Sequence, residues 1–429
     1  MNAPISSLSL QQAPPISVPF RFFLSAPLFL LLAALILLVS GPQALVSRWT
    51  PALLALTHLV TLGFLTMTMI GALMQMLPVL ADSPMPQPRR VAWMVHVPLV
   101  AGTAMLAYGL FFSQTALLDA AIFLLAFALG IFLIAAAYSL AASRVRHATI
   151  HAMHLAGIAL ILTVGLGIAL AGTLSGDFHL PVQELVRLHV AWGLPGWVGL
   201  LVMGVAYQVV PMFQLTPAYP ARLTRWIGGS VFLLLCAVSL ASLTSPLLAS
   251  WGGSLAAGGI AIGFAVFAGI TLYLQAKSRR RIVDVTQQFW RIGMLSLLSA
   301  VALWGGAQRV TGIAADSRYP IVLGVLFMFG FAVSVVSGML YKIVPFLIWF
   351  HLQGRLPKGS AVPNMKQIIP GHAARRQMQA HLATLLLLLS SSAWPVLIYP
   401  AALALGFASC LLWLNLFAAT RLYLKFARL

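Results

Sequence analysis

Two histidines lie inside long apolar segments, where an imidazole can do redox or metal chemistry. They are His58 and His189, two of the ten histidines in the 429 residues. A neutral imidazole in an apolar helix can bind haem iron or copper through one ring nitrogen, while a carbonyl holds its other N–H. The alternative is a histidine that only forms hydrogen bonds within a helical bundle. Neither residue decides between these two roles when it is taken alone.

A second group of histidines lies close to basic residues, at the ends of apolar segments. His151 and His154 are three residues apart, so they share one face of a helix and can chelate one metal ion. His147, four residues before His151, can take part in the same way. The alternative is favoured, because Arg144 and Arg146 flank these histidines and such groups at a membrane interface contact lipid head groups. The other members of the group are His96, His351, His372 and His381.

Three apolar segments end in the same pattern of a glycine, a long polar side chain four residues later and a proline three residues further on. The three patterns are Gly71–Gln75–Pro78, Gly204–Gln208–Pro211 and Gly338–Lys342–Pro345. A second glycine lies eight residues before each pattern, at Gly63, Gly196 and Gly330. The nearly constant interval predicts a threefold internal repeat. The repeats cover about 1–142, 143–276 and 285–424, and His58 and His189 lie at similar depth on two related segments, which favours ligation.

Each part of the repeated pattern has a physical role in a membrane. The glycines allow a neighbouring helix backbone to approach closely, and the proline breaks or kinks the helix and frees backbone carbonyls. Polar side chains at membrane depth are costly and tend to face the interior of a bundle. Gln75, Gln208 and Lys342 are therefore either a central polar ring or local capping groups, and Lys342 can reach the cytoplasmic surface along its own stem.

The elements that carry these residues must be membrane-spanning helices. Apolar residues make up 61% of the chain and charged residues 7%, with a mean hydropathy of +0.99, whereas a soluble domain has roughly 25% charged residues. Apolar runs of about 20 residues can cross a bilayer, and their lack of alternating polarity excludes a barrel. We expect a single membrane domain over residues 1–429, all-α and polytopic. Its twelve predicted spans are about 20–41, 51–80, 91–112, 117–142, 149–174, 185–214, 226–247, 251–276, 288–312, 319–350, 379–395 and 397–424.

The basic residues predict the orientation of these spans. The net charge is +19, and most of the 25 lysines and arginines lie in the loops after even-numbered spans or at the termini. Such loops are cytoplasmic, so both termini are expected there. Only Arg48, Arg187, Arg309 and Arg318 lie on the other side. Insertion into the bilayer accounts for the charge, and a nucleic-acid partner is not expected.

Twelve spans in a threefold repeat, with the second, sixth and tenth spans innermost, resemble subunit I of the haem-copper oxidase superfamily. The segment Pro19-Phe20-Arg21-Phe22-Phe23 and the second span with His58 are also similar to the NnrS family. This resemblance implies a bacterial inner-membrane protein that binds haem b, copper or both, in nitric oxide or redox response or in respiratory metal handling. It implies that His58 is a haem ligand and that His189 is a copper ligand. A redox partner or a second copy of the chain is an implied partner, besides the lipid bilayer.

The chain also departs from the oxidase pattern. The oxidases carry further histidines on the seventh span and on the outer half of the tenth, and this chain has none at those places. We therefore expect no complete binuclear centre and no reduction of oxygen or nitric oxide. No Asp or Glu lies in the interior of a predicted span, which argues against proton pumping. The alternative function is a permease for a metal ion or small solute, which would pass between Gln75, Gln208 and Lys342.

Overall fold

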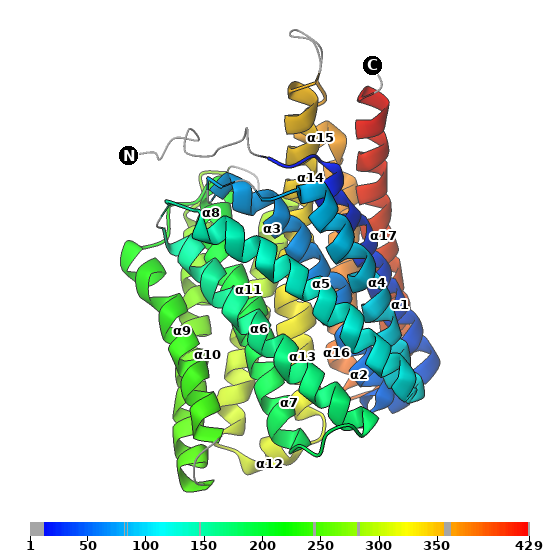
Figure 1. Cartoon of the computed structure of the whole chain (residues 1–429), viewed down its shortest axis with the longest axis vertical. Coiled ribbons are helices and arrows are strands. Elements are labelled where there is room, and N and C mark those ends of the chain that lie inside the picture. Colours follow the sequence, from blue (N-terminus) through cyan, green and yellow to red (C-terminus); the bar gives the residue numbers. More distant parts are fainter. Residues whose placement is uncertain are drawn as a thin grey trace. The chain divides into compact units, whose positions relative to one another are not determined.

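The chain folds into helices in a computed structural model, which describes residues 13–80, 82–83, 85–145, 147–242, 246–280, 284–355 and 362–427. For residues 246–250 only the backbone is described, and no strand occurs in these ranges. Figure 1 labels the helices. In chain order they are α1 (Ser17–Ser40), α2 (Pro51–His58), α3 (Met67–Leu80), α4 (Pro88–Phe112), α5 (Thr115–Ala141), α6 (Ala148–Ser175), α7 (Val182–Ala191), α8 (Leu200–Gln214), α9 (Ala221–Ser242), α10 (Pro246–Ala276), α11 (Val285–Ala307), α12 (Thr311–Ala315), α13 (Tyr319–Gly324), α14 (Ser334–Gln353), α15 (Met365–Ile368), α16 (Gly371–Ser391) and α17 (Ile398–Phe426).

Three stretches of π-helix join pairs of these helices into continuous rods. They are η4 (Leu59–Thr66), η5 (Trp192–Gly199) and η6 (Val325–Val333). Each follows a shorter helix and precedes a longer one, so α2–η4–α3, α7–η5–α8 and α13–η6–α14 each form one span. There are also two short 3₁₀ turns. The turn η3 (Gly41–Leu45) directly follows α1, and η7 (Pro395–Leu397) directly precedes α17.

Within the described residues, eleven helices are long and apolar enough to cross a membrane. The chain is therefore an all-α protein of the multi-pass membrane type. The segment predicted at 379–395 lies in α16, which does not meet the same criterion because its first half holds His372, Arg375 and Arg376. The ends of the other predicted spans agree with the helices to within a few residues.

Contacts between residues divide the chain into two compact units. Unit 1 holds Leu73–Arg280 and Met294–Ala315, and unit 2 holds Pro15–Ala72, Arg281–Gly293 and Asp316–Leu429. Neither unit corresponds to one of the predicted repeats, because each contains parts of more than one. In unit 1, α4 packs on α5, α6 packs on α5, η5 and α8, and α9 runs beside α10 (Figure 1). In unit 2, α1 packs on α17 and η4, α16 packs on α17, and η4 contacts η6.

The inner glycines of the repeated pattern lie where two helix backbones approach most closely. A β-carbon added at any of them would come within 3 Å of a side chain on the first helix of the same predicted repeat, closer than real contacts allow. All three contacts lie within a single unit. The neighbouring atoms are Phe22 Cβ at 2.7 Å for Gly71, Ala152 Cβ at 2.3 Å for Gly204 and Phe289 Cβ at 2.6 Å for Gly338.

Two of the outer glycines, Gly63 and Gly196, make a second contact between the same pairs of helices. A β-carbon at Gly63 would lie 2.4 Å from the Phe29 ring, and one at Gly196 would lie 3.1 Å from Ala159 Cβ. Phe29 and Ala159 come seven residues after Phe22 and Ala152, whereas the outer glycines come eight residues before the inner ones. The two helices are therefore antiparallel, and glycine holds them together at two levels, about two turns apart.

Candidate functional site

The three π segments recur at a constant interval in the chain. They begin at Leu59, Trp192 and Val325, each 133 residues after the one before. Each contains the outer glycine of the repeated pattern, at Gly63, Gly196 or Gly330. Segments of π-helix are rare and occur frequently at functional sites. This makes the histidines next to them the first candidates for function.

His58 is the last residue of α2, directly before η4. The helix that carries it begins at Pro51, with the Thr50 hydroxyl as its cap, accepting from the Leu53 N–H at 3.2 Å. His58 Nδ1 lies 2.8 Å from the Leu54 carbonyl oxygen. A carbonyl can only accept, so Nδ1 carries the proton and Nε2 carries the lone pair. That is the tautomer in which an imidazole binds iron or copper.

His189 lies one turn before η5, near the end of α7, and packs against α6 in unit 1. Its Nδ1 is 3.1 Å from the Thr163 carbonyl oxygen, and a β-carbon at Gly167 would lie 3.2 Å from its Cε1. Thr163 and Gly167 are one turn apart on α6, so the ring fits against this face because Gly167 has no side chain. The carbonyl again places the proton on Nδ1 and the lone pair on Nε2.

His381 is the histidine of the third π segment, and the sequence did not single it out. It lies in α16, is 2% exposed, and its Nε2 is 2.7 Å from the hydroxyl of Ser334, the residue directly after η6. Its ring stacks on Phe329 of η6, with 4.5 Å between ring centroids. The sequence had grouped it with cytoplasmic interface histidines. A signal for its burial exists, because Ala374, Gln377, His381 and Thr384 follow the spacing of one helix face and are all buried.

The predicted pair of His151 and His154 lies on the exposed side of α6. His154 Nδ1 is 2.9 Å from the Ile150 carbonyl oxygen, and His151 lies toward Gly229 of α9. His147 caps the N-terminus of α6, where its Nδ1 accepts from the Ile150 N–H at 3.4 Å. Burial lowers the pKa of His147, which keeps the ring neutral and able to accept this bond. Among the described residues, no three His, Cys, Asp or Glu side chains form a group that could hold a metal ion.

The three polar residues of the repeated pattern have different surroundings. Gln75 is 6% exposed, and its Oε1 has no hydrogen-bond partner in the described part of the chain. Gln208 is half-buried in α8. Lys342 is ion-paired, with its Nζ 2.6 Å from Asp284 Oδ2. Gln75 and Gln208 belong to unit 1 and Lys342 to unit 2, so the predicted polar ring stays a prediction.

The prolines of the pattern do not end their helices. Pro78, Pro211 and Pro345 lie inside α3, α8 and α14, and each helix continues for at least two more residues. Proline therefore removes one helical hydrogen bond without breaking the span. Side chains satisfy the last carbonyls of α8: the Ser278 hydroxyl donates to the Gln214 carbonyl at 2.6 Å, and Arg280 donates to the Phe213 carbonyl at 2.9 Å.

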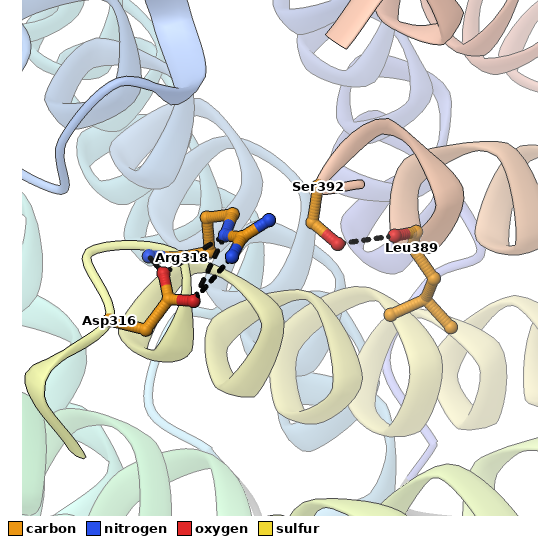
Figure 2. Close-up of polar contacts among 4 residues, drawn as sticks. All are labelled: Asp316, Arg318, Leu389 and Ser392. Carbon is orange, nitrogen blue, oxygen red and sulfur yellow. Dashed lines mark hydrogen bonds and ion pairs between the residues drawn. The ribbon is translucent and has the colours of Figure 1, made fainter. Parts of the chain in front are cut away.

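Outside the spans, unit 2 contains a polar contact at the start of α13. Figure 2 shows the Arg318 guanidinium donating to both carboxylate oxygens of Asp316, the shortest contact being 2.6 Å. It also shows the Ser392 hydroxyl donating to the Leu389 carbonyl at 2.7 Å, at the end of α16. The hydrogen bonds from Arg318 lower the pKa of Asp316 to about 2. These contacts cap helix ends and carry no sign of ligand binding.

Comparison of the chain with protein-family models and with curated proteins found no match. The candidate site therefore stands on its geometry. The candidates are separate positions in the two units: His58 with η4 and His381 with η6 in unit 2, and His189 with η5 in unit 1.

Proposed function

We propose that this protein binds haem in the membrane and that His58 is the residue that would hold the iron. The observation that carries the proposal is the position of His58 at the start of a π segment, with Nδ1 held by the Leu54 carbonyl. That hydrogen bond fixes the tautomer and the direction of Nε2, as it does for many metal-binding histidines. The resemblance to the haem-copper oxidases and to the NnrS family supports the same role.

The donor groups fit haem better than a bare copper ion. A porphyrin supplies four nitrogens to its iron, so the protein needs to supply only one or two axial groups. A copper ion without a macrocycle needs several protein ligands, and the described residues offer no group of three. His189 has the right tautomer for a copper ligand, and it would need partners of another kind, such as methionine sulfur.

In this proposal the chain's own residues hold and orient the haem. Haem, when bound, supplies one-electron redox chemistry or reversible binding of a small gas. Leu54 fixes the ring of His58, and the apolar segments on either side exclude water. The proposed role is in redox or nitric oxide response, and it includes no reduction of oxygen or nitric oxide.

We further propose that α16 crosses the bilayer as the eleventh of twelve spans. Its second half, from Thr384 to Ser391, is mostly leucine, and the helix packs along α17 in unit 2. Twelve spans leave both termini in the cytoplasm, as the distribution of lysine and arginine predicts. The repeated glycine contacts support a pseudo-threefold arrangement of four-helix units in a bacterial inner membrane.

An absorption spectrum of the protein purified in detergent tests haem binding directly. We expect a Soret band in the wild type, and its loss or shift in His58→Ala, with partial return when imidazole is added. His179→Ala is the matched control, because His179 is an exposed histidine in the loop after α6. Metal analysis of the same samples measures iron and copper together. A colourless wild-type protein from cells supplied with haem would contradict the proposal.

A second candidate function is a permease for a small polar solute or metal ion. The observation that favours it is Gln75, a buried amide whose Oε1 has no partner among the described residues. Uptake of a radiolabelled ion or solute into liposomes separates the two functions. Uptake that is lost in Gln75→Leu and retained in His58→Ala would favour the permease.

A further inference from the structure

The N-terminal part of α11 packs antiparallel to α14 in unit 2, and its contacts give the register between them. The Thr286 hydroxyl donates to the Gly338 carbonyl at 2.9 Å. Two turns further along α11, a β-carbon at Gly293 would lie 3.3 Å from the Phe331 carbonyl oxygen. These two contacts lie about two turns apart on each helix. Trp290, midway on α11, therefore lies at the same level as Ser334 on α14.

This level and the next turn of α14, which carries Ser337, contain four polar side chains that are almost completely buried. Trp290 and Ser334 are 0% exposed, Ser337 is 1% exposed and His381 is 2% exposed. Ser334 and His381 bond to each other. By contrast, no described group accepts from the Trp290 Nε1–H or bonds to the Ser337 hydroxyl. Two phenylalanine rings contact the ring of His381: Phe329 stacks on it, and Phe289 lies tilted against it.

The unpaired groups require a ligand that both donates and accepts hydrogen bonds. The indole N–H of Trp290 can only donate, whereas the Ser337 hydroxyl can do both. Ser334 Oγ bonds to His381 and also lies 3.4 Å from the Phe329 carbonyl, to which it can donate. A lone pair on Ser334 Oγ therefore remains for a further hydrogen bond. Buried polar groups are nearly always paired, most strictly where the surroundings are apolar. A small molecule with both functions, held by three or four polar partners, satisfies every group at this level.

We propose that Trp290, Ser334, Ser337 and His381 form a binding site for ordered water within unit 2. The water accepts from Trp290, exchanges hydrogen bonds with Ser337 and joins both to the Ser334–His381 pair. Gln377 lies one turn from His381 on α16, and its Oε1 also lacks a partner among the described residues, so it extends the site toward α17. The site is independent of haem binding, because none of its residues is a proposed haem ligand.

X-ray radiolysis of the protein in lipid nanodiscs tests this directly. Short X-ray pulses create hydroxyl radicals from water, including bound water, and these oxidise adjacent side chains before they diffuse. Trp192 is the matched control, because it is 3% exposed and its Nε1–H donates to the Ser239 hydroxyl at 2.9 Å. We expect mass spectrometry to show Trp290 oxidised several-fold faster than Trp192. Oxidation of Trp290 at or below the rate of Trp192 would overturn the proposal.

Two serine substitutions test the composition of the site. Ser337→Ala removes one water ligand, so it should slow oxidation of Trp290 several-fold and leave that of Trp192 unchanged. Ser409→Ala is the control, because Ser409 is also buried in unit 2 and its hydroxyl already bonds to the Leu405 carbonyl at 2.6 Å. This variant should leave the rate at Trp290 unchanged. An unchanged rate in a folded Ser337→Ala protein would overturn the assignment, and if that variant does not fold, the wild-type comparison decides alone.

Discussion

At the scale of single residues, the surroundings of Lys342 explain how an apolar span tolerates a charge. Asp284 caps the N-terminus of α11 by accepting from the Gln287 N–H at 3.0 Å, and its second oxygen is 2.6 Å from Lys342 Nζ. The side chains are 22% and 21% exposed. The Asp284 carboxylate therefore neutralises the charge of Lys342 and accepts a hydrogen bond from a backbone N–H in the first turn of α11. Both residues lie in unit 2.

Removal of either partner should destabilise the protein more than removal of both. Exposed ion pairs contribute about 0–1 kcal/mol, and loss of one partner of a buried pair costs about 3–5 kcal/mol. For this mostly buried pair we expect Lys342→Met to cost about 2 kcal/mol, because it removes the positive charge beside the Asp284 carboxylate. Unfolding of Lys342→Met, Asp284→Asn and the double variant gives the coupling energy. Strictly additive losses would show that the two groups do not interact.

The second residue-scale prediction concerns the pH dependence of the contact in Figure 2. Arg318 lowers the pKa of Asp316 from 3.8 to about 2 by hydrogen bonding. A carboxyl with a depressed folded-state pKa contributes stability above its unfolded pKa, and the contribution is lost as the pH falls through the folded value. The contact should therefore persist at pH 4 and be lost near pH 2. Carbon-13 NMR of the Asp316 carboxyl measures this, and Arg318→Gln should return the midpoint toward 3.8.

The residue types that could serve as ligands are visible in the sequence, and their partners are not. His58 and His189 stand out because an imidazole is rare in an apolar run. His381 was misplaced because Arg375 and Arg376 precede it and suggest an interface, whereas these arginines lie on the exposed side of α16. The Asp284–Lys342 pair joins residues 58 positions apart, and only the packing of α11 on α14 brings them together.

At the scale of elements, the antiparallel pair of helices is the feature that recurs. The inner glycine of each pattern meets Phe22, Ala152 or Phe289 on its partner helix. In lipid there is no hydrophobic force between helices, so close backbone packing is the main attraction. The sequence predicted this role for glycine from its spacing alone.

Substitution of an inner glycine by alanine should push the two packed helices apart and destabilise the protein. A second substitution that shortens the facing side chain on the partner helix should restore the packing. Gly204→Ala places two β-carbons 2.3 Å apart, and overpacking of this kind costs about 1–3 kcal/mol. Adding Ala152→Gly removes the clash and should recover most of the loss. Gly130→Ala on α5 is the control, because no atom lies within 4 Å of its added β-carbon. The melting temperature in detergent measures all four proteins, and equal effects at Gly204 and Gly130 would contradict the packing role.

The spans were predictable and the π segments were not. Length and apolarity set the ends of a span, so the predicted limits 51–80 match α2 to α3. A π segment contains one residue more than the α-helical winding it replaces. Because the residues around it are all apolar, the hydropathy of the sequence does not change where the π segment begins or ends. The glycines at Gly63, Gly196 and Gly330 mark the right places, although glycine alone indicates close packing as readily as a change of helix type.

At the scale of the whole molecule, the position of α16 decides the side on which the chain ends. Eleven spans place the two termini on opposite sides of the membrane and twelve place them on the same side. The predicted repeats need α16 as a span, since three units of four helices cannot be built from eleven. The arginines in its first half favour an end at the cytoplasmic surface.

Reporter proteins fused to the C-terminus test whether the chain crosses the membrane eleven or twelve times. We expect green fluorescent protein fused after the last residue to fluoresce and alkaline phosphatase at the same place to be inactive, because the proposed twelve spans place the C-terminus in the cytoplasm. Fusions after Ser113, in the loop between α4 and α5, are the control and should give the opposite result. An active phosphatase at the C-terminus would show that α16 does not cross.

Each π segment also sets the angular phase between the two halves of its span. One additional residue rotates all that follows by about 100° relative to an uninterrupted helix. In the span Pro51–Leu80, η4 lies between His58 and Gly71, so it determines the direction of the imidazole when Gly71 is seated against Phe22. A deletion of one residue in η4 would turn His58 about a quarter of the way round while every side chain stayed chemically intact. The direction of His58 is therefore a property of helix winding, and it can be lost without any change at the histidine itself.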